Sequence, residues 1–336
     1  MTDNKKIDIV PLGVDACGYY RLAQQGRLLQ MMNRDVTLSP ALKFRFIGQD
    51  VLYTQRLCSE GLLKAVKDFK EKTKIKIYCD FDDLVWEYLG EGLPEYNWVN
   101  TKVDWKKNTE AMKSMLDVVV DKVSVSTEFL KDAVKQFVPE EKITVIPNML
   151  NVQDWHFDVA TQYPRELSFY YAGSMTHYWN DRKLAGDFEP GWVKYLQNKK
   201  IITKASTPFF MKPLHQYGPS ALNTYSKDFY NEARQCKFVI APLADNVFNR
   251  CKSPLKLLET AAIGRVCLVS DFTDCPYSAL AHPYQKIPAG TTYKGIEYIV
   301  QRAEEHYSEI LKHQYEVLKN YWLDSHMDVY TKFLFE

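Results

Sequence analysis

Three features that many sequences carry are missing from this 336-residue chain. No run approaches the roughly 18 consecutive apolar residues that a membrane-spanning helix needs. The residues before the first expected strand form no apolar signal core. Acidic and basic residues nearly cancel, for a formal net charge of +1 at pH 7. Bulk charge therefore does not indicate nucleic acid or an anionic membrane as a partner, although balanced totals can include a local patch.

A regular cysteine pattern is also missing. The seven cysteines are scattered along the chain without C-x-x-C spacing, and several fall within expected strands. We interpret them as reduced, mostly buried thiols, which suits a cytoplasmic protein. Neither a disulfide framework nor a zinc site is expected.

The chain lacks a G-x-G-x-x-G dinucleotide fingerprint, but it opens with the same kind of unit. Residues 6–12 alternate as a strand, a loop holds Gly13 and Gly18, and a helix runs to about Met32. Strand, glycine loop and helix begin a doubly wound α/β domain. The layout returns in the second half, where a strand at 167–171 leads to Gly173 and Ser174. Because the length suits two domains, the predicted fold class is α/β with two Rossmann-like doubly wound domains.

The most informative stretch spans residues 248–264, between two apolar strands. Ser253 is a good N-cap, Pro254 favours the first helical position and Gly264 favours a stop, so a helix is expected over about 254–263. Free N–H groups at such a helix start attract phosphate. Positive charge and donors surround that start, from Asn249, Arg250, Lys252 and Lys256. Glu259, further along the helix, could accept hydrogen bonds from hydroxyls of the same ligand.

A diphosphate next to a diol is what a nucleotide-sugar offers, and the stretch resembles the nucleotide-sugar motif of GT-B glycosyltransferases. The retaining enzymes of the family 4 type show Lys-Ser-x-x-Lys-x-x-Glu before small residues and a glycine. The matching positions here are Lys252, Ser253, Lys256, Glu259, Ala261, Ala262 and Gly264. Much of that family has a second Glu near the transferred sugar, eight residues before the first, and here that position is Cys251. Taken alone, the stretch also fits an amphipathic helix with a lysine-rich exposed face.

The resemblance implies roles for further residues. In the family, the Glu of the motif holds the ribose of the donor, the first glycine loop faces the cleft, and a second glycine loop lies near the donor phosphates. The expected donor-binding residues are Gly13, Gly173, Ser174, Asn249, Arg250, Lys252, Ser253, Lys256 and Glu259. Arg21, which follows the first loop, is expected at the reacting groups; its alternative is a solvated position on the helix. A UDP-sugar is the expected donor, and no metal is required because protein cations bind the diphosphate.

Three carboxylates, Asp80, Asp82 and Asp83, follow the apolar strand at 74–79. In open α/β sheets ligands bind at the carboxyl ends of strands, so Asp82 or Asp83 could act as a base or hold the acceptor. One of them could instead cap the next helix, and two could hold a divalent metal, as in the D-x-D motif of GT-A enzymes. The predicted catalytic residues are Asp82, Asp83 and Arg21.

The function expected from these patterns is transfer of a hexose or pentose from a nucleotide-sugar to a hydroxyl acceptor, with retention. Compact GT-B proteins of this type also occur in bacteriophages, where some modify DNA, so the predicted acceptor is a hydroxymethylated DNA base. The alternatives are a polysaccharide or small-molecule acceptor, or a non-catalytic nucleotide- or carbohydrate-binding protein; Cys251 favours the last. A sugar-phosphate phosphorylase or epimerase is a weaker alternative.

The expected organisation has three parts. Residues 1–150 form an acceptor domain and residues 151–305 form a donor domain. Residues 306–336 form a helical segment that crosses back toward the first domain, as in GT-B proteins.

Overall fold

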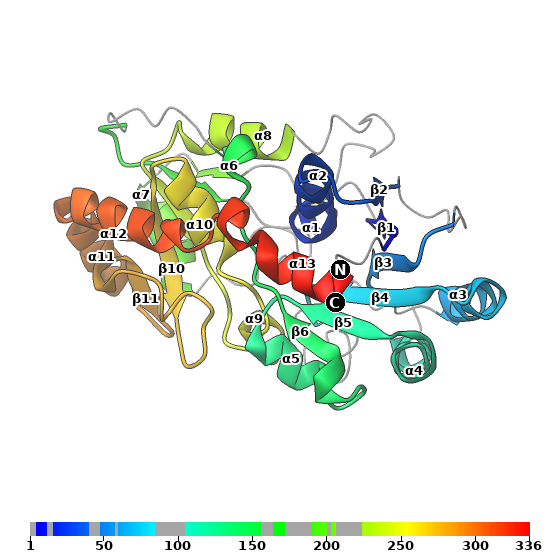
Figure 1. Ribbon diagram of the computed structural model, residues 1–336. Coiled ribbons are helices and arrows are strands. Elements are labelled where there is room, and N and C mark those ends of the chain that lie inside the picture. The colour runs from blue at the N-terminus through cyan, green and yellow to red at the C-terminus, as the bar shows by residue number, and fades with distance from the viewer. Residues whose placement is uncertain are drawn as a thin grey trace.

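Two parallel sheets, each covered by helices, make up most of the structure, a computed structural model of the chain (Figure 1). It describes residues 5–11, 16–39, 48–57, 60–84, 105–155, 164–171, 190–199, 203–205 and 224–336. The α/β class and the doubly wound layout predicted from the sequence are both confirmed.

The first sheet has six strands in the order β2-β1-β3-β4-β5-β6, and all neighbouring strands are parallel. The strands are β1 (Ile7–Val10), β2 (Val36–Leu38), β3 (Val51–Gln55), β4 (Lys76–Phe81), β5 (Lys122–Val125) and β6 (Ile143–Val145). The main helical segments are α1 (Ala16–Gly18), the π-helical η1 (Tyr19–Ala23), α2 (Gln24–Met31), α3 (Glu60–Thr73), α4 (Trp105–Ser114), the π-helical η3 (Met115–Val119) and α5 (Glu128–Val134).

Both faces of the first sheet are covered, which explains its nearly continuous apolar strands. Side chains alternate between the faces along a strand. In β4, Ile77 and Cys79 enter one core cluster and Tyr78 enters the other. Thr127 ends the turn after β5, where its hydroxyl accepts a hydrogen bond from the Leu130 N–H and caps α5.

The second sheet has five parallel strands in the order β11-β10-β9-β7-β8. The strands are β7 (Phe169–Tyr171), β8 (Thr203–Ala205), β9 (Phe238–Ala241), β10 (Val266–Asp271) and β11 (Lys286–Pro288). The helices are α7 (Pro190–Lys199), α8 (Thr224–Ala233), α9 (Val247–Arg250), α10 (Leu255–Ala262), α11 (Tyr293–Glu305) and α12 (Tyr307–Lys319).

Among the described residues, two segments connect one half of the molecule with the other. After β6 the chain passes through α6 (Val152–Trp155) to the second sheet, and after α12 it returns as α13 (Met327–Phe335). Tyr330, Phe333 and Leu334 of α13 share a core cluster with residues of β1, β3 and α2 (Figure 1). The C-terminal helix is thus built into the first half of the molecule.

Each sheet has one point where the strand order reverses, between β1 and β3 in the first and between β7 and β9 in the second. Open α/β sheets bind ligands outside the carboxyl ends of their strands at such points. Phe248 and Cys251, which follow β9, pack into a core cluster of the first sheet. The two halves therefore meet at the edge where ligand binding is expected.

Candidate functional site

Helix α10 carries the predicted nucleotide-sugar motif and directs Glu259 toward the first half of the molecule. The Glu259 side chain is buried, with 0% of its area exposed. Its Oε1 accepts a hydrogen bond from the Tyr20 hydroxyl at 2.7 Å, and its Oε2 pairs with the Lys256 ammonium at 2.8 Å. Gly264 adopts φ +67° just beyond the helix, so the predicted stop is confirmed. A carboxylate has about four lone-pair sites, so two donors leave about two of them for further hydrogen bonds.

The predicted N-cap role of Ser253 is wrong. Pro254 occupies the cap position of α10, and no side chain caps the helix there. The Ser253 hydroxyl instead accepts a hydrogen bond from the Asn148 carboxamide at 2.8 Å. Asn148 follows β6 in the first half, so a contact between residues far apart in sequence takes the hydroxyl away from its own helix.

Lys252 bridges the two halves through Asp83. Its ammonium lies 3.1 Å from one carboxylate oxygen of Asp83, and the Arg56 guanidinium lies 3.5 Å from the other. The side chains of Lys252, Asp83 and Arg56 are 16%, 24% and 23% exposed, so all three reach solvent. Lys252 also sits 4.2 Å from the centre of the Phe248 ring, within cation–π range. Of the residues predicted as site residues, Asp83 and Lys252 are thus in direct contact.

Arg56 is a site residue that the sequence analysis did not identify. It follows β3 with a left-handed backbone, φ +47°, which is unusual for a residue with a Cβ. Its guanidinium binds the Asp82 carboxylate at 2.7 and 2.9 Å and donates to the Cys17 sulfur at 3.1 Å. The signal that points to it is its position, a cation directly after a strand next to the reversal point.

Asp82 is held as a carboxylate. Burial acts to raise its pKa, but the Arg56 charge and hydrogen bonds outweigh burial and lower the pKa to about 2. A general base works best with a pKa near the operating pH, so this pairing makes Asp82 a weak base. The prediction that Asp82 or Asp83 caps a following helix falls on residues 85–104, which lie outside the described residues.

Cys17, Asp82 and Asp83 are also the one group among the described residues whose ligand atoms lie close enough to hold a metal, all within 4.8 Å of one another. The Arg56 guanidinium contacts all three side chains. The Arg56 guanidinium thus lies among the sulfur and carboxylate oxygens that would be the ligands of a metal.

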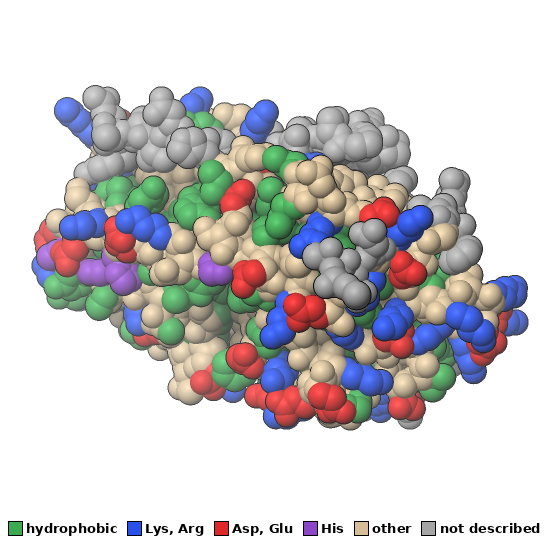
Figure 2. Space-filling view, in the orientation of Figure 1, with side chains coloured by type: hydrophobic (Ala, Val, Ile, Leu, Met, Phe, Trp, Pro, Cys, Tyr) green, Lys and Arg blue, Asp and Glu red, His purple; other side chains and the backbone are tan. Residues whose placement is uncertain are grey.

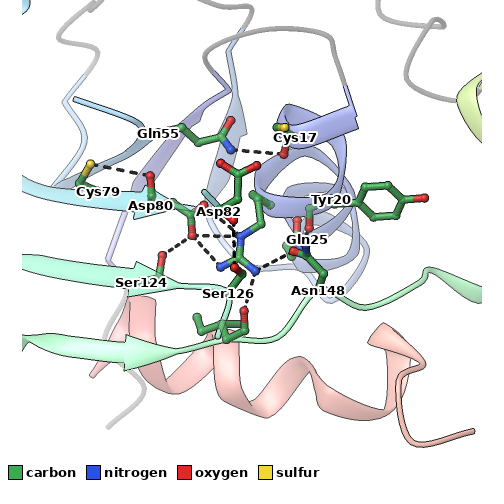
Figure 3. Close-up of polar contacts among 12 residues, drawn as sticks. Cys17, Tyr20, Gln25, Gln55, Cys79, Asp80, Asp82, Ser124, Ser126 and Asn148 are labelled. Carbon is green, nitrogen blue, oxygen red and sulfur yellow. Dashed lines mark hydrogen bonds and ion pairs between the residues drawn. The ribbon is translucent and has the colours of Figure 1, made fainter. Parts of the chain in front are cut away.

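Arg21, predicted at the reacting groups, lies in a buried network with Asp80 and Asn148, two residues that Figure 3 labels. Its side chain is 0% exposed, like that of its partner Asp80, and two parallel contacts of 3.0 and 2.8 Å join them. The same guanidinium donates to the Ile146 carbonyl at 2.5 Å and to the Asn148 carboxamide at 2.9 Å. Burial acts to lower the pKa of Arg21, but Asp80 more than offsets it, so the guanidinium stays charged.

The remaining predicted donor-binding residues fall into two groups. The Asn249 side chain donates to the Ala244 carbonyl at 2.9 Å, and Arg250 pairs with Asp245 at 2.7 Å, so both make contacts within the segment after β9. Gly13, Gly173 and Ser174 lie outside the described residues. In the part of the chain that is described, no helix combines the length and the apolar character needed to cross a bilayer.

Comparison with known proteins gives structural neighbours only. No protein-family model matches the sequence, and no curated protein matches it. Sucrose-phosphate synthase from Thermosynechococcus elongatus has a TM-score of 0.59 at 11% identity, covering 98% of this chain and 99% of that one. Anabaena Alr3699/HepE in complex with UDP-glucose has a TM-score of 0.55 at 9% identity, with 98% of both chains covered.

A third neighbour is the β-glucosyltransferase BGT of phage T4, in complex with UDP and Mn²⁺. Its TM-score is 0.54 at 15% identity, with 98% of this chain and 99% of that chain covered. Likeness at such low identity speaks for the fold alone, and it extends over nearly the full length of these three proteins. The chain therefore has the GT-B fold, two Rossmann-like α/β units, as the sequence predicts.

Proposed function

We propose that the protein is a glycosyltransferase that takes its sugar from a UDP-sugar. The observation that carries this proposal is the place of the motif at 252–259. It follows the strand at the reversal point of the second sheet, and Lys252, Ser253 and Glu259 each contact the first half. Fold neighbours crystallised with UDP or UDP-glucose support the choice of donor.

The proposed roles follow from charge and position. Lys252 and Lys256 stabilise the diphosphate as it leaves, because fixed cations favour a developing anion. Glu259 accepts hydrogen bonds from the ribose hydroxyls of the donor. These replace the hydrogen bond that it accepts from the Tyr20 hydroxyl in the free protein. Arg21 has no exposed area, so we assign it to positioning: it fixes Asn148, which in turn holds Ser253 at the start of α10.

We propose retention at the anomeric carbon. Inversion calls for a base at the acceptor, and Asp82, with a pKa of about 2, is poorly suited to that work. Cys251, which stands where the related motif has its second Glu, is buried, and its carbonyl accepts a hydrogen bond from Thr127 at 2.9 Å. The absence of a carboxylate there favours a donor sugar that makes fewer contacts, such as a pentose.

We propose that residues 1–150 bind the acceptor, that residues 151–305 bind the donor, and that residues 306–336 form the helices that return to the first half.

For the acceptor we propose a hydroxymethylated base in DNA, and a phage enzyme among the fold neighbours supports it. Lys70 of α3 does not offer a free charge, because it pairs with Asp121 at 2.8 Å. Figure 2 shows acidic and basic side chains interspersed on this face around α3, α4 and α5. DNA contact would therefore involve a different face or local pairs of lysines.

The donor test is incubation of the purified protein with a panel of UDP-sugars, with mass spectrometry of the released nucleotide. We expect slow UDP release from one or two of them, and loss of that release in Lys252→Ala. Release is expected to survive EDTA, because Arg56 and the lysines supply the positive charge. Absence of both release and UDP binding would overturn the proposal in favour of another function on this fold.

The acceptor test uses duplex DNA with and without hydroxymethylated pyrimidines, together with the sugar that the panel identifies. Transfer to the modified duplex alone, weakening steeply with salt, is expected. Anomeric analysis of the product by NMR tests retention in the same experiment. UDP release without transfer to either duplex would point to a polysaccharide or small-molecule acceptor.

A further inference from the structure

Asp83, Arg56 and Lys252 form an ion-pair cluster that joins the two halves of the chain. One carboxylate is shared by two cations, one from each half, at 3.5 and 3.1 Å. All three side chains are partly exposed, and they lie at the carboxyl ends of their sheets. Asp83 is thus an accessible anion held between two cations, and a phosphate group is another anion that such cations bind.

The two cations are held in place by other partners. Arg56 makes its short contacts with Asp82 at 2.7 and 2.9 Å and with the Cys17 sulfur, and Lys252 sits over the Phe248 ring at 4.2 Å. The 3.5 Å contact between Arg56 and Asp83 is longer than an ordinary hydrogen bond between nitrogen and oxygen. Moving Asp83 away would therefore leave both cations in position.

The charges of the cluster show what would follow. Arg56 and Lys252 are balanced by Asp82 and Asp83, so the cluster is neutral as it stands. Without the Asp83 carboxylate it would carry one net positive charge. The planar fork of Arg and the point charge of Lys both suit phosphate oxygens.

We infer that Arg56 and Lys252 form a phosphate subsite across the two halves, and that the Asp83 carboxylate occupies it until the diphosphate of the donor displaces it. This inference rests on the proposed function and adds Arg56 to the donor site. Asp83 competes with the donor in the free protein, and on displacement it becomes a carboxylate without its two cations, beside the bound sugar nucleotide.

The test is calorimetric titration of UDP and of uridine into the wild type and Asp83→Asn. A competing carboxylate weakens binding of an anion, so the variant is expected to bind UDP about fivefold more tightly, with uridine affinity unchanged. Asp121→Asn is the matched control, because it removes the same charge from an ion pair with Lys70 at 2.8 Å at the opposite edge of the sheet. It is expected to leave UDP affinity unchanged.

A second variant tests Arg56 itself. Removing Arg56 alone would leave the buried Asp82 without its cation, so the double variant Arg56→Gln with Asp82→Asn keeps a neutral pair. We expect it to bind UDP about tenfold more weakly while uridine affinity is unchanged. Equal or weaker UDP binding by Asp83→Asn, or unchanged UDP binding by the double variant, would overturn the subsite. Failure of the wild type to bind UDP at all would instead refute the proposed function.

Discussion

Two clusters of charged side chains lie at the carboxyl end of the first sheet. They differ in the exposed area of their side chains and in the lengths of their contacts. Arg21 and Asp80 are 0% exposed, and Ser124 adds a 2.5 Å hydrogen bond to the same carboxylate. Arg56, Asp83 and Lys252 are partly exposed, with longer contacts of 3.1 to 3.5 Å. A buried pair with every group in contact supports a structure, whereas an open set of shared charges can exchange one partner for a ligand.

The difference lies in where each cation sits on the sheet. Arg21 belongs to η1, and its partner Asp80 belongs to β4 itself. Both side chains are buried. Asp83 lies beyond the end of that strand, in the turn that faces the second half. A shift of three residues along one segment thus separates a supporting carboxylate from an accessible one.

The sharpest way to break this comparison is to neutralise each carboxylate in turn. Asp80→Asn leaves the Arg21 charge buried without its partner, so we expect it to lower the free energy of unfolding by about 3–5 kcal/mol. Asp83→Asn is expected to change it by at most about 1 kcal/mol, because its ion pairs are partly exposed. Urea denaturation of both variants measures the difference. Similar losses in the two variants would show that the clusters are equally structural.

Lys252 sharpens the comparison on the functional side. We expect Lys252→Ala to lower kcat about 100-fold or more, since its charge acts on the developing diphosphate, and to weaken UDP binding much less. Steady-state kinetics with the active UDP-sugar measures both effects. Lys113→Ala, which removes an exposed lysine paired with Glu110, serves as the control. A rise in KM with unchanged kcat would contradict a role in the transition state.

Asp82 pairs with Arg56 of the partly exposed cluster but is itself buried. The pH dependence of stability should show how strongly this pairing lowers its pKa. Its pKa is depressed in the folded protein, from an ordinary 3.8 to about 2, so its stabilising contribution is complete above pH 4 and is lost as the pH falls through 2. We expect the contribution to be about 2 kcal/mol. Unfolding free energies of the wild type and Asp82→Asn, measured from pH 6 to pH 2, should converge at the acid end. A constant difference across that range would contradict the assignment.

Glu259 is buried like Asp80 but is proposed to serve the ligand. We expect Glu259→Gln to weaken UDP affinity by about 1–3 kcal/mol, the scale of lost charged hydrogen bonds. Tyr20→Phe removes the hydroxyl that donates to Glu259 in the free protein. Because this hydroxyl competes with the ribose, the variant should bind UDP as tightly as the wild type or more tightly. Calorimetric titration measures both variants. Unchanged affinity in a folded Glu259→Gln protein would remove Glu259 from the ribose site.

The sequence predicts the architecture well because its signals are local. Alternation of apolar strands with helices gives the two sheets, and Gly264 marks the end of α10 where its backbone turns left-handed. Asp83 and Lys252 are each predicted as site residues because each follows a strand of one of the two similar sheets, whereas their direct contact is a finding of the structure. These predictions depend on short-range patterns together with one general rule about strand ends.

The contacts that the sequence does not predict join distant residues. Ser253 has the composition of an N-cap, but Asn148 from the first half takes its hydroxyl. Arg21 looks like a solvated or catalytic cation until Asp80 and Asn148 are found around it. Arg56 gives only a weak signal, because a single cation after a strand is common. Its left-handed backbone is also not predictable, because that conformation usually indicates glycine and this residue is an arginine.

A crystal structure of the protein with UDP tests the central claim most directly. We expect the diphosphate within hydrogen-bond distance of both Lys252 and Arg56, the Asp83 carboxylate moved away from Lys252, and the Arg21–Asp80 pair unchanged. UDP bound elsewhere, with Asp83 still between the two cations, would contradict the claim.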